Sequence, residues 1–399
     1  MKIMVVHPTG NQNVRNAALS FYERNKLFAL VTNVSFNTNK FGYSFLPKKI
    51  LKILEKRDFN KLNRKVIEYS LSKEILRIMH IRYNKFNLIN KYLDYFSTAN
   101  IFNKLSSFAS GLIHKNLEYI YAYENCALEV FKKAKKKNIK CIYELNSIYW
   151  RQRKNLNFSK TKNLFYKYED KLIKDKEIKL SDLIIVPSKN IKDSLKLYPS
   201  YLPKVKVIEY GFPNSRRQKS TYRKHNSLKV MYVGSNIPEK GTKYLIDSLN
   251  SKNILKIENK IELSIVTNSL AKEYFNNKIK IKKKIYTNLP HREVLNLMNK
   301  NHILIVPSIS EGFGMVVTEA MSQSMLVIGT NKTCLRDISK NNNSIVVPIK
   351  NSSIITKTLI YLKNNPKLVN KIRNNAYKTS IKYKWKDYRE RLFKTMNIV

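Results

Sequence analysis

Glycine and cysteine are scarce in this sequence of 399 residues, and long apolar runs are absent. The three cysteines, Cys126, Cys141 and Cys334, are scattered and odd in number. That pattern excludes a disulfide framework and a cysteine-based zinc site. No stretch approaches the roughly 18 to 20 uninterrupted apolar residues of a membrane span. The first residues, MKIMVVHPTG, lack the apolar segment and cleavage site of a signal peptide, so we expect a cytoplasmic protein.

Several sequence motifs of metal and phosphate chemistry are also missing. The six histidines are dispersed, and neither an H-x-x-x-H pattern nor an acidic cluster occurs. We therefore expect no protein-bound metal and no other cofactor. A Walker A motif and a G-x-S-x-G motif are absent as well, which argues against a P-loop nucleotidase and an α/β-hydrolase.

The net charge of +48 raises the question of a nucleic-acid partner. However, the positive surplus in residues 1–210 equals that in residues 211–399, so no basic face or tail stands out. Lys, Asn and Ile are abundant, whereas Gly, Ala and Arg are rare, which is typical of a genome rich in A and T. We therefore expect no specific nucleic-acid partner. A basic surface would still favour peripheral attachment to an anionic membrane surface on its cytoplasmic face.

The few glycines that remain are informative. The chain contains nine, whereas average usage of ~7% would give roughly 28. Glycine in such a sequence indicates a backbone requirement, such as a tight turn or a close approach to a ligand. Five of the nine follow predicted strands: Gly10, Gly234, Gly241, Gly312 and Gly314.

Residues 308–330, SISEGFGMVVTEAMSQSMLVIGT, are predicted to form a turn, a helix and a strand. An apolar strand, 302–307, leads into them, and the helix spans 315–323 with Val316, Ala320 and Met321 on one side. Glu311 enters the turn and Glu319 lies within the helix. This arrangement suits a ligand with a phosphate at the helix start and hydroxyl groups on either side.

Two further strand–loop–helix units are predicted. In the second half, a strand at 228–233 leads into GSNIPEKG, where Lys240 is well placed for a diphosphate, or is a plain surface lysine. At the start of the chain, a strand at 2–6 leads into HPTGNQNVR. Gly10 is a candidate for close approach to a ligand and Arg15 for contact with an anion; the alternative is an ordinary surface loop.

Strands and helices alternate in both halves, which predicts an α/β fold with two Rossmann-like domains facing a cleft. We expect an N-terminal domain at 1–213, a polar linker at 214–227 and a C-terminal domain at 228–399. Residues 41–110 are predicted to be inserted amphipathic helices that cover the sheet or meet a lipid-linked acceptor. The sequence leaves open that the last helix packs back on the N-terminal domain.

Carboxylates follow two of the predicted strands in the first half. Glu124 ends the strand at 117–122, and Glu144 lies at the end of the strand at 140–145. Because α/β domains bind ligands at the carboxyl ends of their strands, we expect both near the site. His291, at the start of a predicted helix, is interpreted as a solvated residue rather than a catalyst.

Taken together, these motifs resemble the GT-B glycosyltransferases of family 4. The family's Glu-x7-Glu signature is met by Glu311 and Glu319 in SEGFGMVVTEAM, and its phosphate loop by YVGSNIPEKG. DLIIVPS at 182–188, HPTGNQNVR at the start and YELNSIYW at 143–150 are similar as well. The resemblance covers nearly the whole chain except residues 41–110.

The resemblance implies a retaining, metal-independent hexosyltransferase. A nucleotide-diphosphate sugar would be the donor, and a glycan or lipid-linked molecule in surface polysaccharide synthesis the acceptor. We expect catalytic roles for Glu311, Lys240, Glu144 and Glu124. The expected substrate-binding residues are Gly10, Arg15, Gly234, Ser235, Gly312, Phe313, Gly314, Met315, Val316 and Glu319.

One departure from the family concerns phosphate binding. Ser235 stands where many members carry Arg, so Arg15 or another residue would have to supply the second cation. Two alternatives to a transferase remain open at this point. The first is an epimerase or hydrolase of nucleotide sugars with the same fold, and the second is a non-enzymatic protein that binds polyanions through its charge.

Overall fold

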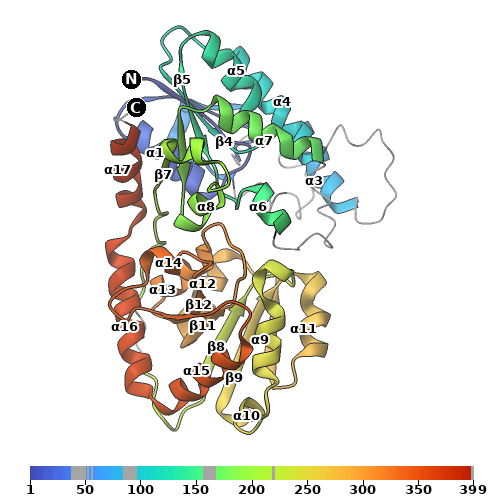
Figure 1. The fold of residues 1–399 in the computed structure, drawn as a ribbon, viewed down its shortest axis with the longest axis vertical. Coiled ribbons are helices and arrows are strands. Elements are labelled where there is room, and N and C mark those ends of the chain that lie inside the picture. Colours follow the sequence, from blue (N-terminus) through green and yellow to red (C-terminus); the bar gives the residue numbers. More distant parts are fainter. Residues whose placement is uncertain are drawn as a thin grey trace.

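The computed structural model describes residues 1–36, 57–83, 97–155, 168–217 and 221–396, together with Leu51 and Leu54. Two sheets form the framework of this part, one in each half of the chain (Figure 1). All pairings between their named strands are parallel, as expected when helical crossovers connect successive strands. The predicted class, α/β with two Rossmann-like units, is confirmed.

The first sheet has seven strands, and the direction of its strand order reverses between β1 and β4. Residues of β1 alternate between two hydrophobic cores, because successive side chains of a strand point to opposite faces. In spatial order the strands are β3 (Val66–Glu68), β2 (Leu27–Thr32), β1 (Ile3–Val6), β4 (Tyr119–Tyr123), β5 (Lys140–Glu144), β6 (Leu183–Val186) and β7 (Val205–Val207).

Helices cover both faces of this sheet. One face packs against α1 and the end of the chain, and the other packs against α4, α5 and α7. The helical segments are α1 (Gln12–Tyr22), η2 (Asn60–Lys65), α3 (Leu71–Tyr83), α4 (Thr98–Gly111), α5 (Leu128–Lys136), α6 (Trp150–Asn155), α7 (Tyr168–Leu180), α8 (Lys189–Ser194) and η6 (Pro199–Lys204).

The second sheet has six strands around the central pair β8 and β11. In spatial order they are β10 (Lys283–Thr287), β9 (Ile261–Thr267), β8 (Leu228–Val233), β11 (Ile303–Val306), β12 (Leu326–Thr330) and β13 (Ile345–Val347). The helical segments are η7 (Pro238–Lys240), α9 (Thr242–Leu249), α10 (Lys252–Leu255), η8 (Glu258–Lys260), η9 (Ser269–Ala271), α11 (Lys272–Lys278), α12 (His291–Lys300), α13 (Met315–Ser322), α14 (Leu335–Ile338), α15 (Ser352–Asn364), α16 (Pro366–Lys382) and α17 (Trp385–Met396).

The prediction of helices throughout residues 41–110 is wrong at Val66 and Ile67. Both lie in β3, which pairs with the edge of the sheet at β2. β-Branched residues favour strands, and only the tertiary pairing decides the matter for so short a segment. Leu71, Ile75 and the rest of α3 are helical as predicted. The expected helical positions Ile50, Leu88, Ile89 and Leu93 lie outside the described residues.

The chain passes between the two sheets twice, and the two crossings lie side by side. Phe212 N donates to Tyr383 O at 2.7 Å, and a Cβ on Gly211 would lie 2.4 Å from Trp385 Cα. After the second crossing, α17 packs against α1 of the first sheet (Figure 1). Arg389 Nε lies 2.9 Å from Glu23 Oε2 across that contact.

Candidate active site

The turn between β11 and α13 forms the centre of the site. Gly314 precedes α13 with φ +88°, a left-handed conformation that a residue with a side chain adopts only at a cost. The first turn of α13 contains no acidic residue, so its unpaired N–H groups and positive dipole end can receive an anion. Val317, Ala320 and Met321 are the buried apolar face of this helix, whereas Val316, predicted to share that face, is half-buried.

Lys240 and Glu311 meet in this site although 71 residues separate them in sequence. Lys240 Nζ lies 2.6 Å from Glu311 Oε2, and Ser308 Oγ donates to the same oxygen at 3.3 Å. Backbone bonds join the two loops, because Ile309 N donates to Glu239 O at 2.8 Å. Both charged side chains remain partly exposed, so a polar ligand could reach them.

The glycines of the loop after β8 are needed for packing. Gly241 has φ +66°, and a Cβ there would lie 1.9 Å from Pro307 O, at the start of the β11–α13 turn. A Cβ on Gly234 would lie 2.7 Å from the hydroxyl of Tyr232, which donates to Ser235 O at 3.2 Å. Gly234 and Ser235 are therefore held by Tyr232, and Gly241 brings Lys240 close to the turn.

Glu319 lies within α13 and pairs with the first residue of α12. His291 Nε2 lies 2.9 Å from Glu319 Oε1. His291 is about half exposed, in agreement with its interpretation as a solvated residue, and the structure adds the contact with Glu319. The sequence offered no signal for this contact, because only the packing of α12 against α13 brings the two side chains together.

The two carboxylates of the first half are buried and hold one loop. Glu144 Oε1 accepts hydrogen bonds from Asn13, Tyr210 and Asn146 at 3.0 to 3.2 Å, and burial raises the pKa of Glu144. Glu124 Oε2 accepts from Ser147 Oγ at 2.8 Å and pairs with Lys174 Nζ at 2.7 Å. The pair thus fixes consecutive residues of the loop that follows β5.

This loop touches the turn from the other half of the chain. A Cβ on Gly312 would lie 2.3 Å from Asn146 O, so glycine permits the contact. Phe313, the next residue, packs edge-on against Tyr210, with ring centroids 5.1 Å apart. Met315 and Val316 are half-buried against the same core. The structure therefore places the Glu311–Glu319 region directly against the loop that Glu124 and Glu144 hold.

Gly10 and Arg15 are engaged within the first half. A Cβ on Gly10 would lie 2.5 Å from Arg57 Cα, so packing against Arg57 already requires glycine at this position. Arg15 donates to the Asp58 carbonyl at 3.4 Å. Burial lowers the pKa of this arginine.

The described part of the chain contains no group of three or more His, Cys, Asp or Glu side chains that could hold a metal ion. The three cysteines are free and buried.

Two facing parallel sheets, with a glycine turn and a helix start at their junction, define the GT-B class of folds. Residues 213–379 match the model of the family described as glycosyl transferases group 1.

A curated relative matches over part of the chain. An uncharacterized glycosyltransferase of Methanocaldococcus jannaschii is 31% identical over 214 residues, which cover 51% of this chain and 56% of the relative. The chain thus spans about half the length of this relative.

Solved structures match over the full length at low identity. The Anabaena protein HepE in complex with UDP-glucose has a TM-score of 0.65 at 14% identity, covering 100% of both chains. An E. coli trehalose-6-phosphate structure bound with UDP-2-fluoro glucose has a TM-score of 0.67 at 8% identity, covering 100% of this chain and 99% of that one. A glycosyltransferase from Rickettsia africae has a TM-score of 0.61 at 17% identity, covering 100% and 97%. At these identities the likeness shows the fold.

Proposed function

We propose that this protein is a glycosyltransferase that takes a hexose-type sugar from a nucleotide-diphosphate donor. The observation that carries the proposal is the Lys240–Glu311 pair at 2.6 Å beside the glycine turn that opens α13. A cation, a carboxylate and a helix start together match a ligand with phosphates and sugar hydroxyls. Similar folds bind UDP and UDP-glucose, which supports a donor of this class.

Each residue of the second half then has a distinct proposed role. Lys240 and the N–H groups of α13 neutralise the diphosphate, with Gly234 and Ser235 lining its loop. Glu311 and the backbone of the glycine turn bind the hexose, and Glu319 accepts hydrogen bonds from the ribose hydroxyls.

The reaction follows from these contacts. The bond between the anomeric carbon and the diphosphate oxygen breaks, and the acceptor hydroxyl forms the new bond on the same face of the sugar. The acceptor proton leaves with the diphosphate. Charge develops on that leaving group, where Lys240 and the start of α13 stabilise it. We propose that no metal ion is needed and that the anomeric configuration is retained.

Glu124 and Glu144 are buried, and we propose that they support the site indirectly. Both were expected to be catalytic, and their contacts support a role through Ser147 and Asn146. They hold these two residues against the turn between β11 and α13, residues 307–314, which is called the donor turn below. Gly10 is proposed to face the diphosphate from the first half of the chain, and Arg15 or another residue to supply the cation that is missing at Ser235. The proposed acceptor is a glycan or a lipid-linked molecule in surface polysaccharide synthesis.

We also propose peripheral attachment to the inner face of the cytoplasmic membrane, because the net charge of +48 favours anionic lipid. None of the described helices is long and apolar enough to cross a membrane. Co-sedimentation with anionic vesicles at low salt should retain the protein and lose it as salt rises. Equal recovery with neutral vesicles would contradict the proposal.

Turnover of a panel of nucleotide sugars, with and without glycan and lipid-phosphate acceptors, tests the enzyme class. Glu311→Gln should abolish transfer and leave the unfolding temperature close to that of the natural chain. Glu262→Gln, which alters an exposed glutamate paired with Lys229 at 4.0 Å, is the matched control and should retain full activity. Rapid product formation from the donor alone would instead favour the epimerase or hydrolase.

A further inference from the structure

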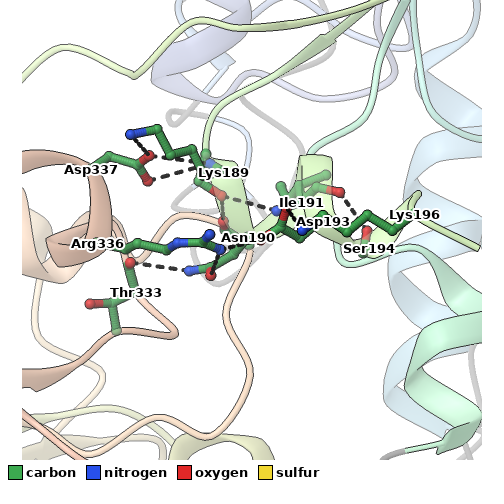
Figure 2. A network of polar contacts seen from close by, with 11 residues as sticks. Lys189, Asn190, Ile191, Asp193, Ser194, Lys196, Thr333, Arg336 and Asp337 are labelled. Carbon is green, nitrogen blue, oxygen red and sulfur yellow. Dashed lines mark hydrogen bonds and ion pairs between the residues drawn. The ribbon is translucent and has the colours of Figure 1, made fainter. Parts of the chain in front are cut away.

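Helix α8, which follows the DLIIVPS segment, faces α14 across the junction between the two halves of the chain (Figure 2). Arg336 of α14 donates from Nη1 to Asn190 Oδ1 at 3.2 Å and forms an ion pair with Asp193. In return, Asn190 Nδ2 donates to Thr333 O at 3.2 Å. One short helix thus contacts both the backbone and the side chains of the other half.

Asp337 completes this contact at the start of α8. Its carboxylate oxygens accept from Lys189 N at 3.3 and 3.4 Å, and Lys189 Nζ lies 4.0 Å away. A carboxylate is favoured at a helix start, where N–H groups lack partners. The side chain of Asp337 is fully buried, whereas Asp193 and Arg336 are about a third exposed. The junction therefore has a buried polar centre and an ion pair at its rim.

The same contacts continue into the donor turn. Cys334 N donates to Phe313 O at 2.7 Å, so the segment that carries Arg336 and Asp337 supports the turn from behind. On the other side, Ser188 Oγ donates to Gly312 O at 2.5 Å and also accepts from Ile191 N within α8. The donor turn is thus held between α14 and the start of α8.

We propose that Asp193, Asn190, Arg336 and Asp337 form an interdomain latch that positions the donor turn against the acceptor-side loop at Asn146. The inference rests on the proposed transferase function. None of the four is proposed to touch the donor, whose contacts come from Lys240, Glu311 and Glu319. Loss of the latch should therefore slow turnover through misplaced reactants and leave donor affinity nearly unchanged.

A charge-swap cycle tests the latch. Asp193→Arg and Arg336→Asp each place like charges across the junction, whereas the double variant restores opposite charges. Each single variant should lower kcat by about ten- to a hundredfold, as expected for displaced groups. The double variant should recover most of the loss, and KM for the donor should change less than about threefold in all of them.

Lys196→Ala is the matched control, because Lys196 lies just after α8, pairs with Asp193 at 3.1 Å on the same side of the junction and, among the described residues, forms no ion pair across it. It should retain the kcat of the natural chain. Single variants with unchanged kcat, or a double variant as slow as the singles, would overturn the latch. A single variant that loses donor affinity as much as kcat would overturn it as well.

Small-angle scattering provides a readout that needs no activity. Each single variant should show a larger radius of gyration than the natural chain, and the double variant should return to the natural value. If no nucleotide sugar supports turnover, the proposed function fails while scattering still decides on the latch. Equal radii in all four proteins would refute the latch even if transfer is confirmed.

Discussion

At the scale of single residues, partners decide what a titratable side chain does. Glu319 is proposed to bind the ribose, a role that the resemblance to family 4 implies, and the structure adds His291 at 2.9 Å from it. The histidine is about half exposed, whereas the carboxylate is largely covered. His291 can therefore orient the carboxylate while leaving its second oxygen for a ligand.

Glu319→Gln should raise KM for the nucleotide sugar by about tenfold, with a smaller change in kcat. A neutral amide replaces a charged acceptor of ribose hydrogen bonds, and such bonds contribute about 1.5–3 kcal/mol. Steady-state kinetics with varied donor measure the effect. Glu293→Gln, an exposed site in the first turn of α12, should leave KM unchanged. A fall in kcat alone would argue against the ribose role.

A second residue-scale prediction concerns His302. Its Nδ1 accepts from Lys229 N at 3.0 Å, and its ring packs on Tyr222. Burial lowers the pKa of His302 from 6.5 to about 3. Because the unfolded chain binds this proton and the folded chain does not, stability should fall as pH drops from 6.5 toward 3.

His302→Asn removes this titration and keeps an acceptor for Lys229 N. Between pH 7.5 and pH 5, the natural chain should lose about 2 kcal/mol more of its free energy of unfolding than the variant. Urea unfolding at both pH values measures the difference. If the free energy of unfolding falls equally in the two proteins, His302 is protonated at pH 5 in the folded state as well as in the unfolded state.

At the scale of elements, strands with a strong apolar pattern were predictable, whereas short elements with a weak pattern were not. The strand at 228–233 has the predicted bounds. β10, KKIYT, was missed because an edge strand carries polar residues and its pattern is weak. α14 was missed because a single turn has no period to detect.

Turn glycines allow a prediction at this scale. Gly241→Ala should destabilise the protein by about 2–3 kcal/mol, because alanine is strained at φ +66° and its Cβ would meet the Pro307 carbonyl. In contrast, a Cβ on Gly111 would meet no atom within 4 Å. Gly111→Ala should therefore be neutral or stabilising by up to about 1 kcal/mol. Denaturant unfolding compares them, and equal effects would contradict the packing argument.

At the scale of the whole molecule, the last described helix, α17, packs into the hydrophobic core that covers one face of the first sheet. Tyr388, Leu392 and Met396 of α17 are fully buried in the same cluster as Ile3 and Val5. Arg24 also pairs with Glu390 at 2.5 Å. The first sheet therefore depends on α17, which follows the second sheet in the sequence. The proposed domain limits, with a linker at 214–227, remain a prediction.

Leu392→Ala should lower the free energy of unfolding by about 2–5 kcal/mol, the usual range for a buried leucine. Hydrogen exchange should accelerate in β1 and α1 more than in β9, because α17 packs on the first unit. Lys394→Ala, an exposed change on the same helix, should alter neither. Faster exchange confined to the second sheet would show that α17 stabilises the other unit.

The sequence by itself determined the α/β class, and it predicted the candidate site of the second half. The apolar strands, the few glycines and the Glu311–Glu319 spacing are local features of the sequence, and such features can be recognised in a single sequence. Only the tertiary structure decided which loops meet. It joined Lys240 to Glu311, paired His291 with Glu319 and turned Glu124 and Glu144 into supports of a loop. The physical reason is that such contacts depend on the order of strands in the sheet and on how the crossover helices pack. Local sequence patterns do not specify either.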